Sequence, residues 1–128
     1  MITVVGAVIV ENDKILCAQR AAGASLPHKW EFPGGKIEAN ESPEEALTRE
    51  IEEEMSCRIQ VGERVEQIVY AYDFGTVHLT TFYCQIIAGI PRRTEHASIK
   101  WLSPFELATL DWAPADLPTV KRIEKDFR

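Results

Sequence analysis

The segment best suited to chemistry is a run of glutamates. Glu50, Glu53 and Glu54 are spaced i, i+3 and i+4. At about 100° of rotation per residue, a helix gathers these carboxylates beside the apolar stripe within Leu47–Met55. Like charges next to a buried face repel one another because water screens them poorly there. A divalent cation would relieve this repulsion, so the spacing predicts a metal site.

The donor atoms of this predicted site are all oxygens. Such ligands favour Mg²⁺, Mn²⁺ or Ca²⁺ over zinc, and Mg²⁺ also binds substrate phosphates. We therefore predict Mg²⁺ as the cofactor, with Mn²⁺ as an alternative, and phosphate chemistry at the site. The competing interpretation is a solvated acidic helix face. Glu45, Arg49 and Glu52 fall on the opposite side of the helix, and no chemical role is predicted for Glu45 or Glu52.

A glycine pair precedes the acidic helix. Trp30–Phe32 is predicted to be a short strand that runs into a tight loop at Pro33–Gly35. Without a Cβ, Gly34 and Gly35 let backbone groups approach a ligand closely, although such pairs also occur in ordinary turns. Lys36 is a candidate phosphate contact, or simply a solvated lysine.

Several further elements must position these groups. Residues 42–55 carry a strong helix signal, because Ser42 can cap the helix and Pro43 suits its first position. Residues 4–10 and 14–20 are predicted to form a hairpin that ends at Arg20. Further strands are predicted at 58–61, 65–72, 77–88 and 100–102, followed by a short helix from Ser103 and a C-terminal helix with Leu117, Val120, Ile123 and Phe127 on one face. This order indicates an α+β fold of mixed strands around helices.

The composition limits the classes of partner. The 128 residues allow a single domain, residues 1–128, with one sizeable core. The formal charge of −6 argues against binding to nucleic-acid polymers, and the three cysteines lack CxxC pairing and are expected to be buried thiols. The apolar opening lacks a basic flank and is far shorter than the ~20 residues of a membrane-spanning helix. We predict a cytoplasmic protein that binds no membrane; the sequence does not indicate its oligomeric state.

The glycine and glutamate spacing resembles a known motif. Gly35, five residues, Glu41, seven residues and then Arg49–Cys57 is similar to the Nudix box, with Ser56 where that pattern has Gly. Trp30–Lys36 and Trp112–Pro118 resemble the MutT-like branch of this family, and the second of these motifs resembles its CTP pyrophosphohydrolase subgroup. The resemblance implies a Nudix α/β/α sandwich with a mixed β-sheet between helices, and a hydrolase acting on phosphorus-containing acid anhydrides.

The resemblance also implies roles for residues within the box. It assigns metal binding to Glu50, Glu53, Glu54, the carbonyl of Gly35, and Glu95, whose other interpretation is an exposed loop residue. Glu41 and Arg49 resemble a salt bridge that braces the helix and the loop without taking part in the chemistry.

Outside the box, the resemblance suggests contacts with substrate. Arg20 is similar to an arginine that contacts phosphate, although an ordinary surface role is equally open. Phe32 is a candidate to stack on the base, or a core residue. Asp116 is a candidate to read the base edge, or a helix cap. If Asp116 is ionised, its carboxylate would favour the amine of cytosine. If it is protonated, its carboxyl would favour an oxidised purine.

The implied reaction is Mg²⁺-dependent cleavage of a nucleoside triphosphate to a monophosphate and pyrophosphate. A water molecule activated by metal would attack a phosphorus atom of the triphosphate, with Glu53 or Glu50 as general base. In MutT-like enzymes, the attacked atom is expected to be the β-phosphorus. CTP, dCTP and modified nucleotides are the expected substrates. The alternatives are an 8-oxo-dGTP diphosphatase, a hydrolase of a diphosphate-linked metabolite such as a nucleotide sugar, and a Nudix module that senses a nucleotide without cleaving it.

Overall fold

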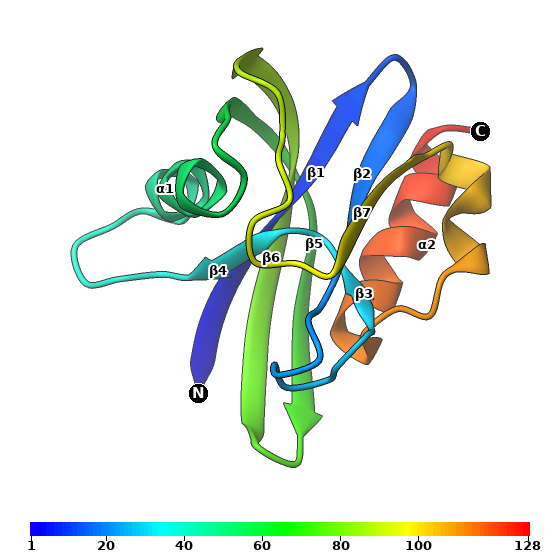
Figure 1. Ribbon diagram of the computed structural model, residues 1–128. Coiled ribbons are helices and arrows are strands. Elements are labelled where there is room, and N and C mark those ends of the chain that lie inside the picture. Colours follow the sequence, from blue (N-terminus) through cyan, green and yellow to red (C-terminus); the bar gives the residue numbers. More distant parts are fainter.

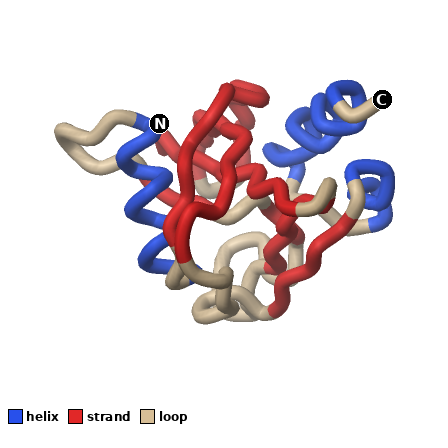
Figure 2. Tube along the Cα trace, turned by 90° about the horizontal axis from the view of Figure 1, so that it is seen from above, coloured by secondary structure: helices blue, strands red, loops and turns tan.

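A computed structural model describes the whole chain, residues 1–128. The strands form a layer with α1 on one side and α2 on the other, as Figure 1 and the view from above in Figure 2 both show. The elements in chain order are β1 (Ile2–Glu11), β2 (Lys14–Gln19), β3 (Trp30–Glu31), β4 (Gly34–Lys36), α1 (Pro43–Met55), β5 (Arg58–Tyr72), β6 (Gly75–Ala88), β7 (Ser98–Leu102), the 3₁₀ helices η1 (Pro104–Thr109) and η2 (Pro114–Asp116), and α2 (Leu117–Asp126). The predicted α/β/α sandwich with a mixed sheet is confirmed.

Strand β1 is the centre of the sheet. It pairs in parallel with β6 and antiparallel with β2 and β4, which makes the sheet mixed. The strand order is β3-β2-β1-β6-β5, with β4 on β1 and β7 on β2. The predicted hairpin is confirmed by the pairing of Val10 with Ile15. Because β1 contacts strands on both edges and helices on both faces, its residues Val5 and Ala7–Ile9 are buried, as a continuous apolar run predicts.

Two of the predicted breaks between elements are wrong. Residues 58–61 and 65–72 are not separate strands but parts of the single strand β5, and shifts of register on either side of Arg64 absorb the interruption in the pattern. The Pro33–Gly35 segment is not only a loop, because Gly34–Lys36 forms β4 against β1. A Cβ on Gly34 would lie 1.9 Å from the carbonyl oxygen of Val5, so glycine is required for this close approach of two backbones.

Helix α1 begins and ends as the sequence predicts. The hydroxyl of Ser42 accepts a hydrogen bond from the backbone N–H of Glu45, and the carboxylate of Glu45 accepts one from the backbone N–H of Ser42. The helix exit is maintained although Ser56 replaces the glycine of the motif, because Ser56 itself adopts the left-handed conformation at φ 56° and donates to the carbonyl of Glu52.

The two helices cover two apolar cores on opposite faces of the sheet. Leu47, Ile51 and Met55 of α1 are fully buried against one face. Val120 and Ile123 of α2 pack on the other face together with residues of η1 and β2. The predicted stripe of α2 is wrong at one position, because Leu117 is exposed in the first turn, while Thr119 is buried with its hydroxyl 2.9 Å from that of Thr81.

The three cysteines form no disulfide. Cys17, Cys57 and Cys84 are free and buried, as predicted. Burial raises the pKa of the Cys17 thiol to about 12, so this group is inert near neutral pH. No helix of the protein combines the length and apolar character required to cross a bilayer.

Candidate active site

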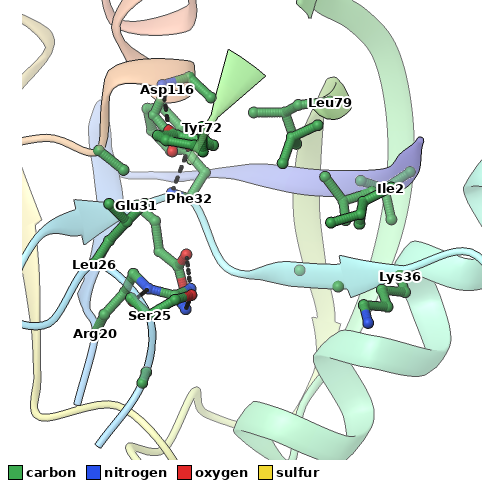
Figure 3. Close-up of a pocket in the computed structure, with 18 of the residues that line it drawn as sticks. Ile2, Arg20, Ser25, Leu26, Glu31, Phe32, Lys36, Tyr72, Leu79 and Asp116 are labelled. Atoms are coloured by element: carbon green, nitrogen blue, oxygen red, sulfur yellow. Dashed lines mark hydrogen bonds and ion pairs between the residues drawn. The ribbon is translucent and has the colours of Figure 1, made fainter. Parts of the chain in front are cut away.

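One cavity of about 500 Å³ lies beside β1 and brings two kinds of side chain together. Its charged end is lined by Arg20, Glu31, Gly35, Lys36, Glu54, Glu95 and His96. Its apolar end is lined by Ile2, Val4, Phe32, Tyr72, Phe74, Leu79, Ala115 and the carboxyl of Asp116. Figure 3 shows Arg20 and Glu31 together near Ser25, while Tyr72 and Asp116 gather near Phe32. The cavity thus joins a site for charged groups to a site for a flat apolar ring.

Helix α1 supplies the acidic wall. The side chain of Glu50 is 16% exposed and lies against β4, where a Cβ on Gly35 would come within 2.4 Å of its carboxyl carbon. Glu54 lies one turn further along the helix and lines the cavity. Only glycine at position 35 leaves room for the Glu50 carboxylate between the strand and the helix.

Glu54 carries an unsatisfied oxygen. Its Oε2 atom is buried and has no hydrogen-bond partner in the protein. Burial raises the pKa of the Glu54 carboxyl to about 9, and the charges of Glu31, Glu50 and Glu95 act in the same direction. A buried polar atom without a partner is costly, and a cation placed among these carboxylates would relieve both the missing contact and the repulsion. The donor set therefore fits a divalent metal ion.

Glu53 is the most exposed of the three predicted ligands of α1. Its side chain is 61% exposed and its Oε2 lies 3.4 Å from Nη1 of Arg49. No three His, Cys, Asp or Glu side chains are assembled closely enough to hold an ion. Glu50 and Glu53 thus share a contact with Nη1 of Arg49, while the buried Oε2 of Glu54 has no partner, and all three remain predicted ligands.

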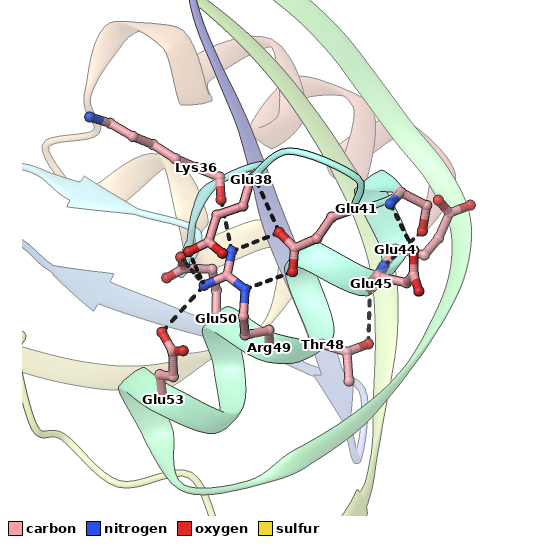
Figure 4. Close-up of polar contacts among 10 residues, drawn as sticks. Lys36, Glu38, Glu41, Glu44, Glu45, Thr48, Arg49, Glu50 and Glu53 are labelled. Carbon is pink, nitrogen blue, oxygen red and sulfur yellow. Dashed lines mark hydrogen bonds and ion pairs between the residues drawn. The ribbon is translucent and has the colours of Figure 1, made fainter.

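Arg49 braces the acidic end, as Figure 4 shows. Its Nε and Nη2 donate to the two oxygens of Glu41 at 2.7 and 2.9 Å, and its Nη1 donates to Glu50 at 2.9 Å. Its Nη2 also reaches the carbonyl of Lys36 at 3.1 Å, which ties the helix to β4. The guanidinium lowers the pKa of Glu41 and keeps it ionised. Arg49 therefore faces the glutamates of the site, and its predicted placement on the opposite side of the helix is wrong.

Glu95 is brought to the cavity by the loop between β6 and β7. The loop is fixed to the end of α1, because the backbone N–H of Arg92 donates to the carbonyl of Met55 at 2.9 Å and the hydroxyl of Thr94 donates to that of Glu54. At its other end, the backbone N–H of Ala97 donates to the carbonyl of Gln19 at 2.8 Å. Glu95 is exposed on this loop and close enough for its charge to act on Glu54.

The two basic candidates differ in their surroundings. Arg20 is not an ordinary surface arginine, because it is paired with Glu31 at 2.8 Å and donates to Ser25 through two other nitrogens. Lys36 lines the same cavity but is exposed, and its ammonium makes no hydrogen bond. Arg20 is thus held in place, whereas Lys36 is free to move towards an anion.

Asp116 is a buried carboxyl at the apolar end. Its side chain does not cap α2; instead its Oδ1 accepts a hydrogen bond from the backbone N–H of Phe32 at 3.3 Å. Burial raises the pKa of Asp116 well above its ordinary value, with a further contribution from the charge of Glu31. The capping interpretation is wrong, and the second carboxyl oxygen remains for a ligand.

The aromatic rings around Asp116 have distinct surroundings. Phe32 is 4% exposed and stacks on Trp112 with ring centroids 4.7 Å apart, so it belongs to the core as well as to the cavity wall. Phe74 is 52% exposed and stacks on Tyr72 at 5.0 Å. The Tyr72 hydroxyl accepts a hydrogen bond from the backbone N–H of Ala115 at 2.8 Å, which holds this ring beside Asp116.

Three residues of the cavity are not predicted by the sequence pattern. Glu31 lies within a predicted strand, His96 lies beside the predicted ligand Glu95, and Tyr72 is predicted only as a strand residue. The alternation of β5 gives no signal for Tyr72, because its partners lie in η2. The pairing of Trp30 with Trp112 brings the two tryptophan-containing segments together, but only the folded chain shows which side chains then meet.

Comparisons with known proteins agree with this geometry. The Nudix domain family matches residues 2–123. The chain is 38% identical over 121 residues to the CTP pyrophosphohydrolase of Escherichia coli K12, covering 94% of this chain and 90% of that protein. It is 34% identical over 123 residues to the 8-oxo-dGTP diphosphatase of the same strain, covering 94% of each.

A solved structure of higher identity also matches. The solution structure of the DNA mismatch repair protein MutT, a Nudix hydrolase from methicillin-resistant Staphylococcus aureus 252, is 54% identical with a TM-score of 0.80, and the match covers 98% of this chain and 96% of that one. Nudix hydrolases generally use divalent metal ions, in accord with the carboxylates around Gly35. The chain therefore belongs to the Nudix family and is a hydrolase of phosphorus-containing acid anhydrides in small nucleotide substrates.

Proposed function

We propose that the protein is a Mg²⁺-dependent pyrophosphohydrolase that converts a nucleoside triphosphate and water into the monophosphate and pyrophosphate. The observation that supports this most directly is the single cavity whose charged end contains the unpartnered Glu54 and whose apolar end contains Asp116. Together they match the two halves of a nucleotide, a chain of phosphates and a flat base.

Glu50, Glu54 and Glu95 are the proposed metal ligands, joined by the carbonyl of Gly35 and by Glu53. Mg²⁺ bound there would neutralise phosphate charge and lower the pKa of a bound water; Mn²⁺ suits the same oxygens. Arg20 and Lys36 would contact the phosphate chain. Glu53 or Glu50 would accept the proton of the attacking water, and the exposure of Glu53 leaves it free to turn towards that water.

The base is proposed to lie at the apolar end. Phe32, Tyr72 and Phe74 offer aromatic surface, and Asp116 offers its second carboxyl oxygen to the edge of the base. A cytosine nucleotide is the first candidate: the E. coli relative named CTP pyrophosphohydrolase supports it, and an ionised Asp116 would accept from the cytosine amine.

An oxidised purine nucleotide is the second candidate. The raised pKa of Asp116 favours the protonated carboxyl, which can donate as well as accept and so suits the purine edge. The relative named 8-oxo-dGTP diphosphatase also supports it. A sensor without catalysis is disfavoured, because every carboxylate of the box is present.

A substrate panel tests the proposal. CTP, dCTP, 5-methyl-dCTP, 8-oxo-dGTP, dATP and a nucleotide sugar are incubated with the protein and Mg²⁺, and pyrophosphate, orthophosphate and monophosphate are quantified. We expect equal amounts of monophosphate and pyrophosphate from a cytosine or oxidised purine nucleotide. Release of orthophosphate, turnover of the nucleotide sugar alone, or turnover that persists in excess chelator would each contradict the proposal.

A further inference from the structure

Three side chains form a continuous polar row along one wall of the cavity. His96 Nε2 lies 3.0 Å from Oε2 of Glu31, and Oε1 of Glu31 accepts a hydrogen bond from Nη1 of Arg20 at 2.8 Å. They come from separate parts of the chain: Arg20 directly follows β2, Glu31 lies on β3, and His96 lies on the loop before β7. The row therefore connects the loop that contains Glu95 to the arginine on the other side of the cavity.

The surroundings of His96 determine which ring nitrogen donates. The side chain is 7% exposed, and its Nδ1 atom is buried without a hydrogen-bond partner. A carboxylate can only accept, so a neutral imidazole at this position must carry its proton on Nε2. His96 thus donates to Glu31, and nothing else in the protein orients its ring by a hydrogen bond.

The two partners of Glu31 occupy both of its oxygens. One oxygen faces His96 and the other faces Arg20, although the carboxylate lies close enough to Glu54 for its charge to act there. Because both oxygens are engaged, the contacts with His96 and Arg20 fix the orientation of the Glu31 carboxylate.

Glu31 and Ser25 together fix the guanidinium of Arg20. Its Nε donates to the carbonyl of Ser25 at 2.6 Å, and its Nη2 donates to the Ser25 hydroxyl at 2.9 Å. A guanidinium has five N–H groups, so these contacts and the one to Glu31 leave one N–H on each terminal nitrogen. Arg20 also lines the cavity, and Figure 3 shows it beside Glu31 and Ser25. The N–H groups of a guanidinium suit a bidentate contact with phosphate.

We infer that His96 is a positioning residue for phosphate binding: by holding Glu31, it sets the orientation in which Arg20 presents its two remaining N–H groups to the phosphate chain. The inference rests on the proposed function for the contact between Arg20 and phosphate.

The loop has anchors other than the His96 ring. Backbone groups of Arg92 and Ala97 and the hydroxyl of Thr94 anchor it to α1 and β2. Replacement of the imidazole should therefore leave the loop in place. His96→Leu removes the N–H donor but still fills the buried space with an apolar side chain. His96→Gln instead provides an amide N–H at a similar distance from the backbone. His78→Leu is the matched control, because His78 also makes one side-chain hydrogen bond through Nε2, to Gln67 at 3.2 Å, but does not line the cavity.

The first measurement needs no substrate. The ¹⁵N relaxation of the Arg20 Nη1 group, the nitrogen that donates to Glu31, reports whether the guanidinium is fixed by this contact. We expect a rigid group in the wild type, in His96→Gln and in His78→Leu, and a mobile group in His96→Leu. An equally rigid Arg20 in His96→Leu would overturn the inference whether or not the protein hydrolyses a nucleotide.

The second measurement separates binding from turnover with the preferred nucleotide of the panel. His96→Leu should raise KM about tenfold with kcat within about twofold, and His96→Gln should recover most of the loss. In an Arg20→Ala background, His96→Leu should add less than about twofold, because the two residues act in series. An equal loss in His96→Leu and His96→Gln, or a full effect without Arg20, would show a structural role only. A wild type that cleaves no nucleotide would refute the proposed function, and the relaxation data would still decide the inference.

Discussion

The two ends of the cavity each contain a buried carboxyl, but the two carboxyls are treated differently by the fold. At the apolar end, Asp116 accepts a hydrogen bond from the backbone of Phe32. At the charged end, Glu54 has a buried oxygen without any partner and lies among three other glutamates. The Asp116 carboxyl has one partner within the protein, whereas the buried oxygen of Glu54 has none. This contrast indicates that the unpartnered Glu54 lowers the stability of the folded protein and is available to bind a ligand.

The two ends also differ in how they are assembled. The metal-binding part of the charged end is built largely from α1 and the preceding β4, so its predicted ligands Gly35, Glu50, Glu53 and Glu54 have fixed spacings along the chain. The apolar end is built from β1, β3, the β5–β6 hairpin and η2, and its members meet only through pairings distant in sequence. The first can therefore be predicted from a motif, while the second requires the fold.

Glu54→Gln should have the largest effect on activity. The amide keeps the shape of the side chain but cannot replace a charged metal ligand, so we expect kcat/KM to fall by about 10³-fold or more. Steady-state kinetics with the preferred nucleotide measure this. Glu52→Gln is the matched control, because Glu52 is an exposed glutamate of the same helix that pairs only with Arg58, and its replacement should leave kcat/KM within about twofold. Similar losses in both variants would show that the charge of the helix matters and not the site.

The same substitution should raise stability when metal is chelated. The pKa of Glu54 is about 9 in the folded protein and 4.5 ordinarily, so the folded state holds this proton longer than the unfolded state. Stability is then lost as pH rises between these two values, and Gln removes the loss. In EDTA, Glu54→Gln should unfold about 3–6 °C above the wild type near pH 8 and closer to it near pH 5. If the wild type is as stable as Glu54→Gln or more stable at both pH values, the unpartnered Glu54 does not lower the stability of the folded protein.

Arg49→Lys should have the next largest effect. Lysine keeps the positive charge but cannot contact both oxygens of Glu41 and also Glu50, so Glu50 loses its fixed position. We expect kcat/KM to fall by about 10–100-fold. Arg58→Lys is the matched control, because it makes the same replacement at an exposed arginine, and it should leave kcat/KM unchanged. Activity close to that of the wild type in Arg49→Lys would show that the brace is not required.

Asp116→Asn should change the choice of base without abolishing hydrolysis. As pH rises through its elevated pKa, Asp116 ionises and becomes an acceptor, so the ratio of kcat/KM for dCTP over 8-oxo-dGTP should rise with pH in the wild type. Glu31 and Arg20 act on this pKa in opposite directions, and Tyr72 lies nearby. The Asn variant should lose this pH dependence and shift the ratio by about tenfold. Asp111→Asn, an exposed aspartate paired with Lys29, serves as control. An unchanged ratio in Asp116→Asn would remove Asp116 from base recognition.

Ser56→Gly should leave both ends unaltered. Ser56 adopts a left-handed conformation at the end of α1, which glycine adopts without a steric cost. We expect the free energy of unfolding to rise by about 1 kcal/mol, measured by urea denaturation, with kcat/KM unchanged. A loss of activity would show that the helix exit influences the ligands.

The sequence predicts local features well. The cap at Ser42, the stripe of Leu47 and Ile51 and the β1–β2 hairpin follow from spacing and turn residues, and all are present. These features depend on interactions between residues a few positions apart, and such interactions can be predicted from the residue types and their spacing.

The failures concern close approach and long-range packing. Glycine disfavours strands, so the glycine pair predicts a loop, but here it lets β4 approach β1 at Val5. A helical wheel gives only the direction of the Cβ and so predicts Arg49 away from the site, whereas its long side chain bends back towards Glu50. Glu31 and His96 could not be paired in advance, since 65 positions separate them.

The most direct test of the account is a titration of ¹⁵N-labelled protein with substoichiometric Mn²⁺, followed by the paramagnetic broadening of each amide. We predict that the amides of Gly35, Glu50, Glu54 and Glu95 broaden first, that those of Tyr72 and Ala115 broaden later, and that Glu54→Gln removes this order. Broadening centred on the exposed glutamates Glu44, Glu45 and Glu52, or an unchanged pattern in Glu54→Gln, would show that the charged end of the cavity is not the metal site.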